Sequence, residues 1–597
     1  MPRIITVEGA PRWTIDVVTL TGAAAGQPDR PDSFPSALNV EHMSEWKTCG
    51  RLTTLRELEM LRLMNDITDK DEWNVKVFKD EIVNKWNAEI EAAEFDVTEN
   101  MWNWVIDELR YKAESFGKTG ITTILHGHTV KSDCAIPSHV KENLKAAVSK
   151  LENVPREEKD YHPNTDNQVL DLVHPSLFPL IVGRSRIVKG GTLGVVDGIN
   201  RTGEGDVLKE RPDERGIYDT EFTARDIKET YSEKFQWLPC EVTIKLLAPE
   251  NPDNSDIRCT IESYINNLHP DDHKGLYPVL EEIIARAIPL WNLTLSNVTD
   301  AFKNCHLRID YDAHEYEYPD QRPTQRDDES EDGFCEREAE WEDENRITIL
   351  PDADEFEAPG EPKVKIDLQK DYGRLQVIVK LANIELTPDK PEYGGGSWHV
   401  EGQMNEHICA TALYYYDSEN ITESHLSFRQ QCRFKGGEEL IYDQHIHDFL
   451  PDVYGLQNGE SIVQEIGSVL CREDRLLTFP NIVQHRVEPF SLEDRTKPGH
   501  RKIVALFLVD PNIRIISTAN IPAQRQDWYD RLVPMQQILG PLPAELKNMV
   551  VDELKGFPIS MAEAKELRLE LMKERTAFSH NHDETFRQIH TFSLCEH

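Results

Sequence analysis

Four short apolar runs in the second half of the chain constrain its fold more than any other feature. They cover residues 375–381, 408–416, 476–485 and 501–509. Each run has the length of a strand and is bounded by turn-forming residues. Many short strands joined by turns favour a sandwich or a closed barrel over a parallel sheet. We therefore expect an α+β protein with a double-stranded β-helix core, a jelly-roll, cupin-like barrel with its site near one open end.

The rest of the chain divides by periodicity and composition. Thr54-Leu-Arg-Glu57 fits a capping box, so helices are expected to begin shortly after residue 50. The segment 310–362 is acidic and poor in aliphatic residues, which predicts a solvated, partly disordered insertion. The expected organisation is an irregular arm at 1–50, a helical region at 51–150, a connector with edge strands at 151–240, the core at 241–520 with the acidic insertion, and a helical C-terminal region at 521–597.

Three residues within the strand pattern have the types and spacing of metal ligands. His399 and Glu401 stand two residues apart, and a strand points alternate side chains to one face. His485 ends the third apolar run and would supply another ligand from elsewhere in the sheet. A lone His-x-Glu pair is more often structural. Two histidines and one carboxylate in this order, however, predict the facial triad of non-haem Fe(II) oxygenases.

An arginine after the third ligand favours a site for an organic acid. Arg501 opens the last apolar run, and a permanently charged guanidinium at the mouth of a buried strand needs a carboxylate partner. A bidentate pair with a small dicarboxylate would supply one. Arg495 is a rival for this role, but it lies among turn formers, whereas Arg501 begins a strand and can point inward.

These segments resemble the 2-oxoglutarate and iron(II)-dependent dioxygenase superfamily. The sequence His-Val-Glu at 399–401, followed by Thr-Ala-Leu-Tyr-Tyr at 411–415, is similar to the prolyl hydroxylase pattern of His-Val-Asp and Thr-x-x-Tyr-Tyr. The sequence His-Arg-Val-Glu-Pro at 485–489 is similar to that family's His-x-Val-x-Pro. The chain departs from the pattern in its Glu, which lengthens the ligand arm by one methylene but keeps the oxygen donors.

The resemblance implies cofactors and roles for five residues. Fe(II) would be bound by His399, Glu401 and His485, and 2-oxoglutarate by Arg501 with help from Tyr415. O2 would be the further co-substrate. The implied reaction hydroxylates or otherwise oxidises an unidentified substrate and releases succinate and CO2. Two alternatives stay open: a non-catalytic metal-binding barrel with a binding or regulatory role, and a cupin-like metal enzyme independent of 2-oxoglutarate.

Other segments, among them 170–179, 263–270 and 517–522, look like a fungal family catalogued only as a domain of unknown function. That resemblance implies no substrate. Tyr264 and Asn266 share a face of the strand that precedes a His-Pro turn. We expect these two side chains either to line the cofactor or substrate pocket or to form a polar network that anchors the turn.

Global composition limits the partners. The formal net charge of -41 disfavours a nucleic acid or an anionic membrane, because both would be repelled. The ten cysteines form no dense framework, and no apolar run approaches the roughly 18 residues of a membrane span. We therefore expect a cytoplasmic protein that acts on a small molecule, with a protein substrate as the alternative and a homodimer through the C-terminal helices as an option.

Overall fold

The computed structural model describes eight stretches of the chain and the isolated positions 541, 543 and 546. The stretches are residues 33–93, 95–189, 191–209, 230–246, 257–311, 315–434, 446–532 and 557–592. Most of the expected N-terminal arm and parts of the expected C-terminal region therefore lie outside the described residues.

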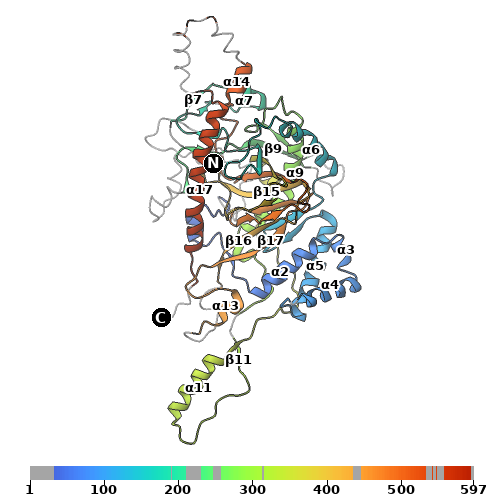
Figure 1. Ribbon diagram of the computed structural model, residues 1–597, viewed down its shortest axis with the longest axis vertical. Helices are drawn as coiled ribbons and strands as arrows, with labels where there is room; N and C mark the ends of the chain where they lie inside the picture. Colours follow the sequence, from blue (N-terminus) through green and yellow to red (C-terminus); the bar gives the residue numbers. More distant parts are fainter. Residues whose placement is uncertain are drawn as a thin grey trace.

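A nine-stranded sheet forms the centre of the molecule (Figure 1). Its order is β10-β9-β13-β21-β15-β18-β3-β2, and β4 pairs with the far half of β13. All its pairings are antiparallel. The strands are β2 (Thr122–Ile124), β3 (Thr129–Ser132), β4 (Val169–Val173), β9 (Cys240–Leu246), β10 (Ile257–Ile261), β13 (Arg374–Leu386), β15 (Ile408–Glu419), β18 (Leu476–Pro480) and β21 (Gly499–Val509).

A second, four-stranded sheet faces the first. Its strands are β1 (Gly50–Arg51), β16 (His425–Arg433), β17 (Val463–Leu470) and β19 (Gln484–Val487). The rings of Phe428 on β16 and Phe479 on β18 meet at 5.1 Å between centroids, and both belong to the largest apolar cluster. The two sheets thus enclose a common core.

The fold expectation is met at the level of an α+β protein with large antiparallel sheets, but the described strands form no closed barrel. The physical reason lies at the two ends of the large sheet. The hairpin of β9 and β10 extends one end and the hairpin of β2 and β3 extends the other, so β10 and β2 are open edges. These two hairpins occupy the ends of the large sheet, where the edge strands of a jelly roll would meet.

Helices cover the sheets and hold the N-terminal region together. Thr54 caps α2 (Leu55–Thr68) by accepting a hydrogen bond from the Glu57 N–H, which confirms the predicted helix start. The Glu57 carboxylate pairs with Arg308 instead of completing the capping box. The other long helices are α4 (Asp80–Ala92), α5 (Glu99–Thr119), α6 (Ser138–Glu152), α9 (Leu276–Val298) and α17 (Met561–Gln588). Helix α9 packs on the large sheet against β10 and β18.

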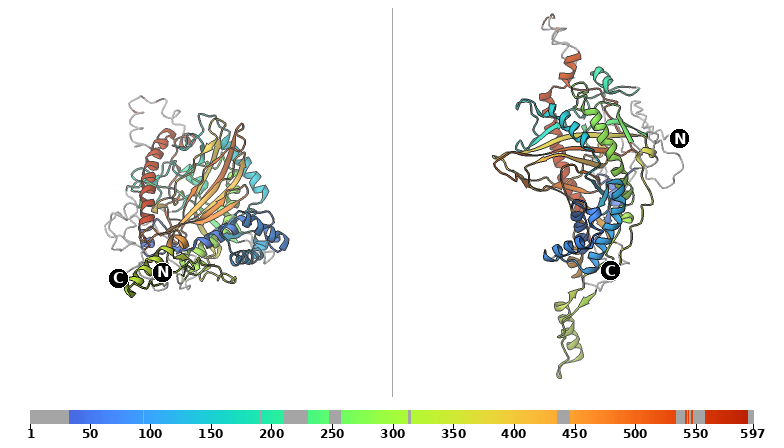
Figure 2. Two further views of the ribbon diagram at one scale, coloured as in Figure 1. Left: turned by 60° about the horizontal axis from the view of Figure 1, so that its bottom comes forward. Right: turned by 90° about the vertical axis from the view of Figure 1, so that its right-hand side faces the viewer.

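The acidic insertion contains more structure than its composition predicts. A short β-pair, β11 (Tyr316–Glu317) with β12 (Ile347–Thr348), forms the base of an arm that carries α11 (Glu331–Asn345). The arm projects from the body in Figure 1 and in the right-hand view of Figure 2. None of the α11 residues is buried, so the predicted solvation holds although the segment is helical. The Ser330 cap and the 2.6 Å ion pair between Arg337 and Glu329 stabilise its start.

Two global expectations are tested in part. None of the helices among the described residues is both long and apolar enough to span a bilayer. The nine described cysteines carry free thiols, and the tenth, Cys595, lies outside the described residues.

Candidate metal centre and its surroundings

The structure brings the three predicted ligands together. An isolated β-bridge joins the backbones of His399 and His485, with N–H to O distances of 3.2 and 2.9 Å. The Glu401 Oε1 atom lies 3.4 Å from His485 Nε2 and 3.9 Å from His399 Nε2. One donor atom from each residue lies within 4.8 Å of the others. Three side chains from two distant segments thus converge on one point.

The hydrogen bonds of His399 leave its inner ring nitrogen available to a metal. His399 Nδ1 lies 2.8 Å from the Ser397 carbonyl, so it carries the proton and leaves the Nε2 lone pair facing Glu401. Burial and then the His485 ring lower the pKa of His399 to about 4. Burial opposes ionisation of Glu401, but the hydrogen bond from His485 and the charge of His399 outweigh it and lower its pKa to about 2. At neutral pH His399 is therefore neutral and Glu401 is ionised.

The surroundings fit a metal as well. His485 Nδ1 is buried without a hydrogen-bond partner, and its ring packs on Phe479 at 4.7 Å between centroids. Asn481 is buried and fixes the backbone of Glu401, with its Oδ1 accepting from the Glu401 N–H at 2.9 Å and its Nδ2 donating to the carbonyl at 3.0 Å. Two imidazoles and a carboxylate in an apolar, rigid setting suit Fe(II).

Arg501 lies inside the protein with no acid beside it. Its side chain is on β21, the residue is 2% exposed, and its Nη1 donates to the Ser424 hydroxyl. The guanidinium carbon lies 5.6 Å from the Tyr415 ring centroid and 5.0 Å from that of Phe490. Its Nε atom is buried without a partner, and none of the described carboxylates comes within ion-pair distance of Arg501. Burial of a guanidinium is costly unless an anion pairs with it.

The other residues singled out from the sequence have partners of their own. Arg495 is 60% exposed and pairs with Glu392 at 2.7 Å, at the surface. The Tyr415 hydroxyl accepts a hydrogen bond from the Cys471 thiol at 3.1 Å, so its contact with Arg501 is through the ring. Tyr264 donates to the Ile521 carbonyl at 3.0 Å, and Asn266 donates to the carbonyls of Leu177 and Phe178. These contacts of Tyr264 and Asn266 anchor loops, and a role in a substrate pocket stays a prediction.

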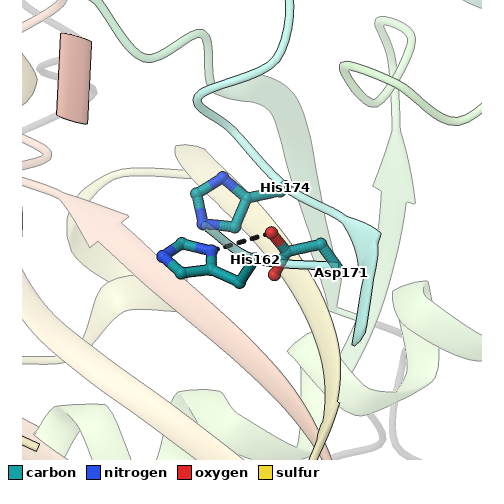
Figure 3. Close-up of side chains that lie close together, drawn as sticks. All are labelled: His162, Asp171 and His174. Atoms are coloured by element: carbon teal, nitrogen blue, oxygen red, sulfur yellow. Dashed lines mark hydrogen bonds and ion pairs between the residues drawn. The ribbon is translucent and has the colours of Figure 1, made fainter. Parts of the chain in front are cut away.

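A second cluster of two histidines and one carboxylate was not anticipated (Figure 3). Asp171 is on β4, His174 directly follows that strand, and His162 precedes it. His162 Nδ1 lies 2.8 Å from Asp171 Oδ2, and one donor atom from each of the three residues lies within 4.8 Å of the others. Asp171 Oδ1 is buried without a hydrogen-bond partner. No spacing rule connects these residues, because the strand pairing brings them together.

The long C-terminal helix supports both clusters. On α17, Arg568 lies 2.6 Å from Asp160 and 3.6 Å from Asp171 beside the second cluster. Nearer the metal centre, Asp583 pairs with Arg429, whose guanidinium lies 4.6 Å from the ring of Trp398, the residue before His399. Figure 1 shows the helix running along the side of the sheets. We expected the C-terminal helices either to pack on the core or to pair subunits, and α17 packs on the core.

Two family models match the chain. One, described as "Protein of unknown function (DUF4246)", matches residues 99–532, and the other, "Domain of unknown function DUF4246, N-terminal", matches residues 12–89. The first match covers well over half of the chain. Nothing among the curated proteins matches.

Solved structures give weak similarities. A structure titled as IDO from Bacillus thuringiensis is 11% identical, with a TM-score of 0.15, over 23% of this chain and 46% of that one. A structure titled as the Fe(II)/(alpha)ketoglutarate-dependent dioxygenase TqaL is 16% identical, with a TM-score of 0.15, over 28% of this chain and 53% of that one. The chain thus spans about half the length of these structures, and scores at this level carry no functional argument.

Proposed function

We propose that this chain, which belongs to the DUF4246 family, is an Fe(II)- and 2-oxoglutarate-dependent dioxygenase that oxidises an organic substrate. One observation carries the proposal: His399 Nε2, Glu401 Oε1 and His485 Nε2 converge, and the Nε2 lone pair of His399 and the ionised carboxylate of Glu401 are available to a divalent iron. The centre lies between two facing sheets, the general setting of a double-stranded β-helix, although the described strands leave the sheet open.

The roles of the residues follow from their contacts. When bound, Fe(II) would supply the coupling of O2 reduction to oxidative decarboxylation of 2-oxoglutarate, with succinate, CO2 and an oxidised substrate as products. The Ser397 carbonyl holds the tautomer of His399. Arg501 binds the distal carboxylate of 2-oxoglutarate, while the rings of Tyr415 and Phe490 wall the guanidinium from water.

Arg501 is what favours 2-oxoglutarate over the two alternatives. A cupin-like metal enzyme without a keto acid, or a barrel with only a binding role, has no use for a buried guanidinium that lacks an acid. The proposed substrate is a small molecule, with a protein side chain as the alternative. A cytoplasmic location and a homodimer stay predictions from the sequence.

Uncoupled turnover tests the proposal without a known substrate. The purified chain is given Fe(II), ascorbate and 2-oxoglutarate under air, and succinate is measured. We expect succinate from the wild type and from the control His139→Ala, which removes an exposed imidazole on α6, and none above background from His399→Ala.

A calorimetric titration with Mn(II) and then 2-oxoglutarate separates the other outcomes. Metal binding without keto-acid binding would select the cupin-like alternative. Binding of both without any succinate, even across a substrate screen, would select the non-catalytic barrel.

A further inference from the structure

Lys380 lies on the same face of the large sheet as Arg501. In the pairing of β13 with β21, Lys380 is opposite Ala505 and Ile384 is opposite Arg501. Since alternate residues of a strand share a face, Lys380 and Arg501 point to the same side. Phe507 and Phe479 belong to this face too, and Phe479 contacts the opposite sheet. The Lys380 side chain therefore starts from the core-facing side of the sheet.

Lys380 is a half-buried cation without an acid. Among the residues that the structure describes, no hydrogen bond or ion pair involves its ammonium group, although Asp and Glu outnumber Lys and Arg by 107 to 66 in the sequence. Other lysines with restricted exposure have carboxylate partners, such as Lys131 with Asp69 and Lys502 with Asp417. Since no carboxylate among the described residues lies at ion-pair distance from this ammonium, the ammonium is available to an anionic ligand.

The charge of Lys380 acts on both side-chain clusters. Burial is the largest influence on all four groups: it lowers the pKa of His399 and His174 and opposes the lowered pKa of Glu401 and Asp171, and at each group the charge of Lys380 lowers the pKa. Asp171 is also opposite Ala382 in the pairing of β4 with β13, and Ala382 is two residues from Lys380 on the same face. Lys380 thus lies between the two clusters.

The second cluster is built for hydrogen bonding. His174 Nδ1 accepts from the Ser176 N–H at 3.1 Å, so in the neutral ring the proton is on Nε2, where a metal would need a lone pair. His162 Nδ1 donates to Asp171, which leaves the His162 Nε2 as an acceptor on the opposite side of the ring (Figure 3). The His162 side chain is 22% exposed, and no described residue bonds to this nitrogen.

We propose that Lys380, flanked by the His162–Asp171 pair, forms a second anion-binding subsite next to the metal centre and holds a carboxylate or phosphate group of the substrate. Lys380 neutralises the oxyanion, and His162 Nε2 accepts a hydrogen bond from a hydroxyl on the same group or beside it. That the bound anion is the substrate rests on the proposed function. The subsite itself does not.

Equilibrium dialysis of 32P-labelled orthophosphate against the metal-free chain tests the subsite. All variants carry Arg501→Leu, so that phosphate cannot occupy the 2-oxoglutarate position. We expect saturable binding that Lys380→Met weakens at least tenfold and His162→Gln weakens several-fold. Lys380→Arg keeps the positive charge and should keep phosphate binding. Retained binding in Lys380→Arg would show that the loss in Lys380→Met comes from the missing charge and not from a folding defect. Lys390→Met, which removes an exposed lysine paired with Asp166, should leave binding unchanged.

Competition with acetate and with methyl phosphate then decides which of the two oxyanions the subsite prefers. Unchanged binding in Lys380→Met would overturn the proposal. So would tight binding of a second Zn(II) per chain that His174→Ala abolishes, because the second cluster would then be a metal site. Phosphate binding at Lys380 together with an absence of succinate across the substrate screen would leave the subsite standing and reject the dioxygenase.

Discussion

Two clusters in this protein each hold two histidines and one carboxylate, yet the hydrogen bonds on the far side of their imidazoles differ. In the cluster of His399, Glu401 and His485, a carbonyl accepts the outer N–H of His399 and frees the inner nitrogen. In the cluster of His162, Asp171 and His174, a backbone N–H donates to the outer nitrogen of His174 and forces the proton inward. Ligand types alone do not define a metal site, because the partner on the far side of each imidazole sets its tautomer.

Removing one histidine from each cluster gives the largest contrast. His485→Ala deletes a ligand, so Mn(II) affinity should fall by more than about 100-fold, since even outer partners of metal ligands are worth about 10–100-fold. His174→Ala should leave the affinity and the number of bound ions unchanged. Calorimetric titration measures both. Equal losses in the two variants would show that the tautomers do not distinguish the clusters.

The two arginines sharpen the comparison at the co-substrate. Arg501→Leu removes a buried charge-assisted contact worth roughly 1.5–3 kcal/mol, so the 2-oxoglutarate concentration for half-maximal succinate formation should rise about 10- to 100-fold. Arg495→Leu removes only the surface pair with Glu392 and should change this 2-oxoglutarate concentration less than about twofold. The reverse ranking would transfer the acid-binding role to Arg495.

Asn481 is the expected support of the first cluster. Asn481→Ala removes the two hydrogen bonds to the Glu401 backbone, so we expect roughly tenfold weaker Mn(II) binding with the chain still folded. Asn420→Ala, which removes amide bonds to the 494–498 turn, is the matched control. Circular dichroism of both variants checks the fold. An unaltered Mn(II) affinity in Asn481→Ala would mean that Glu401 does not depend on Asn481 for its position.

The smallest effect concerns the second cluster and pH. Burial lowers the pKa of His174 well below 6.5. Below pH 6.5 the unfolded chain therefore binds a proton at His174 and the folded chain does not. Stability should therefore fall as pH falls below about 6.5, by up to roughly 1.4 kcal/mol per pH unit from this residue. His174→Gln should remove that share of the slope. Urea denaturation of both forms between pH 7 and pH 5 measures it, and identical slopes would contradict a buried neutral His174.

The sequence predicted the proximity of His399, Glu401 and His485 better than it predicted the sheet around them. The alternation of His399 and Glu401 and the start of a strand at Arg501 are local patterns, and the structure brings these residues to where such patterns point. His162 and Asp171 come together through a local antiparallel bridge between Tyr161 and Leu170, and the residues around them carry no ligand motif that would have singled them out. The open sheet depends on which hairpins add to its edges. Ser424, which contacts Arg501, belongs to no motif.

Helix α17 follows all three predicted ligands in the sequence, so the ribosome makes it after them. Its Arg568 and Asp583 contact the surroundings of both clusters. Every segment that carries a predicted ligand therefore leaves the ribosome before the helix that stabilises the surroundings of that ligand. A newly made chain therefore has its ligands before it has its completed site. Premature termination before residue 561 would yield a product with all the histidines and carboxylates of both clusters but without helix α17. We expect cellular quality control to treat this product as incompletely folded.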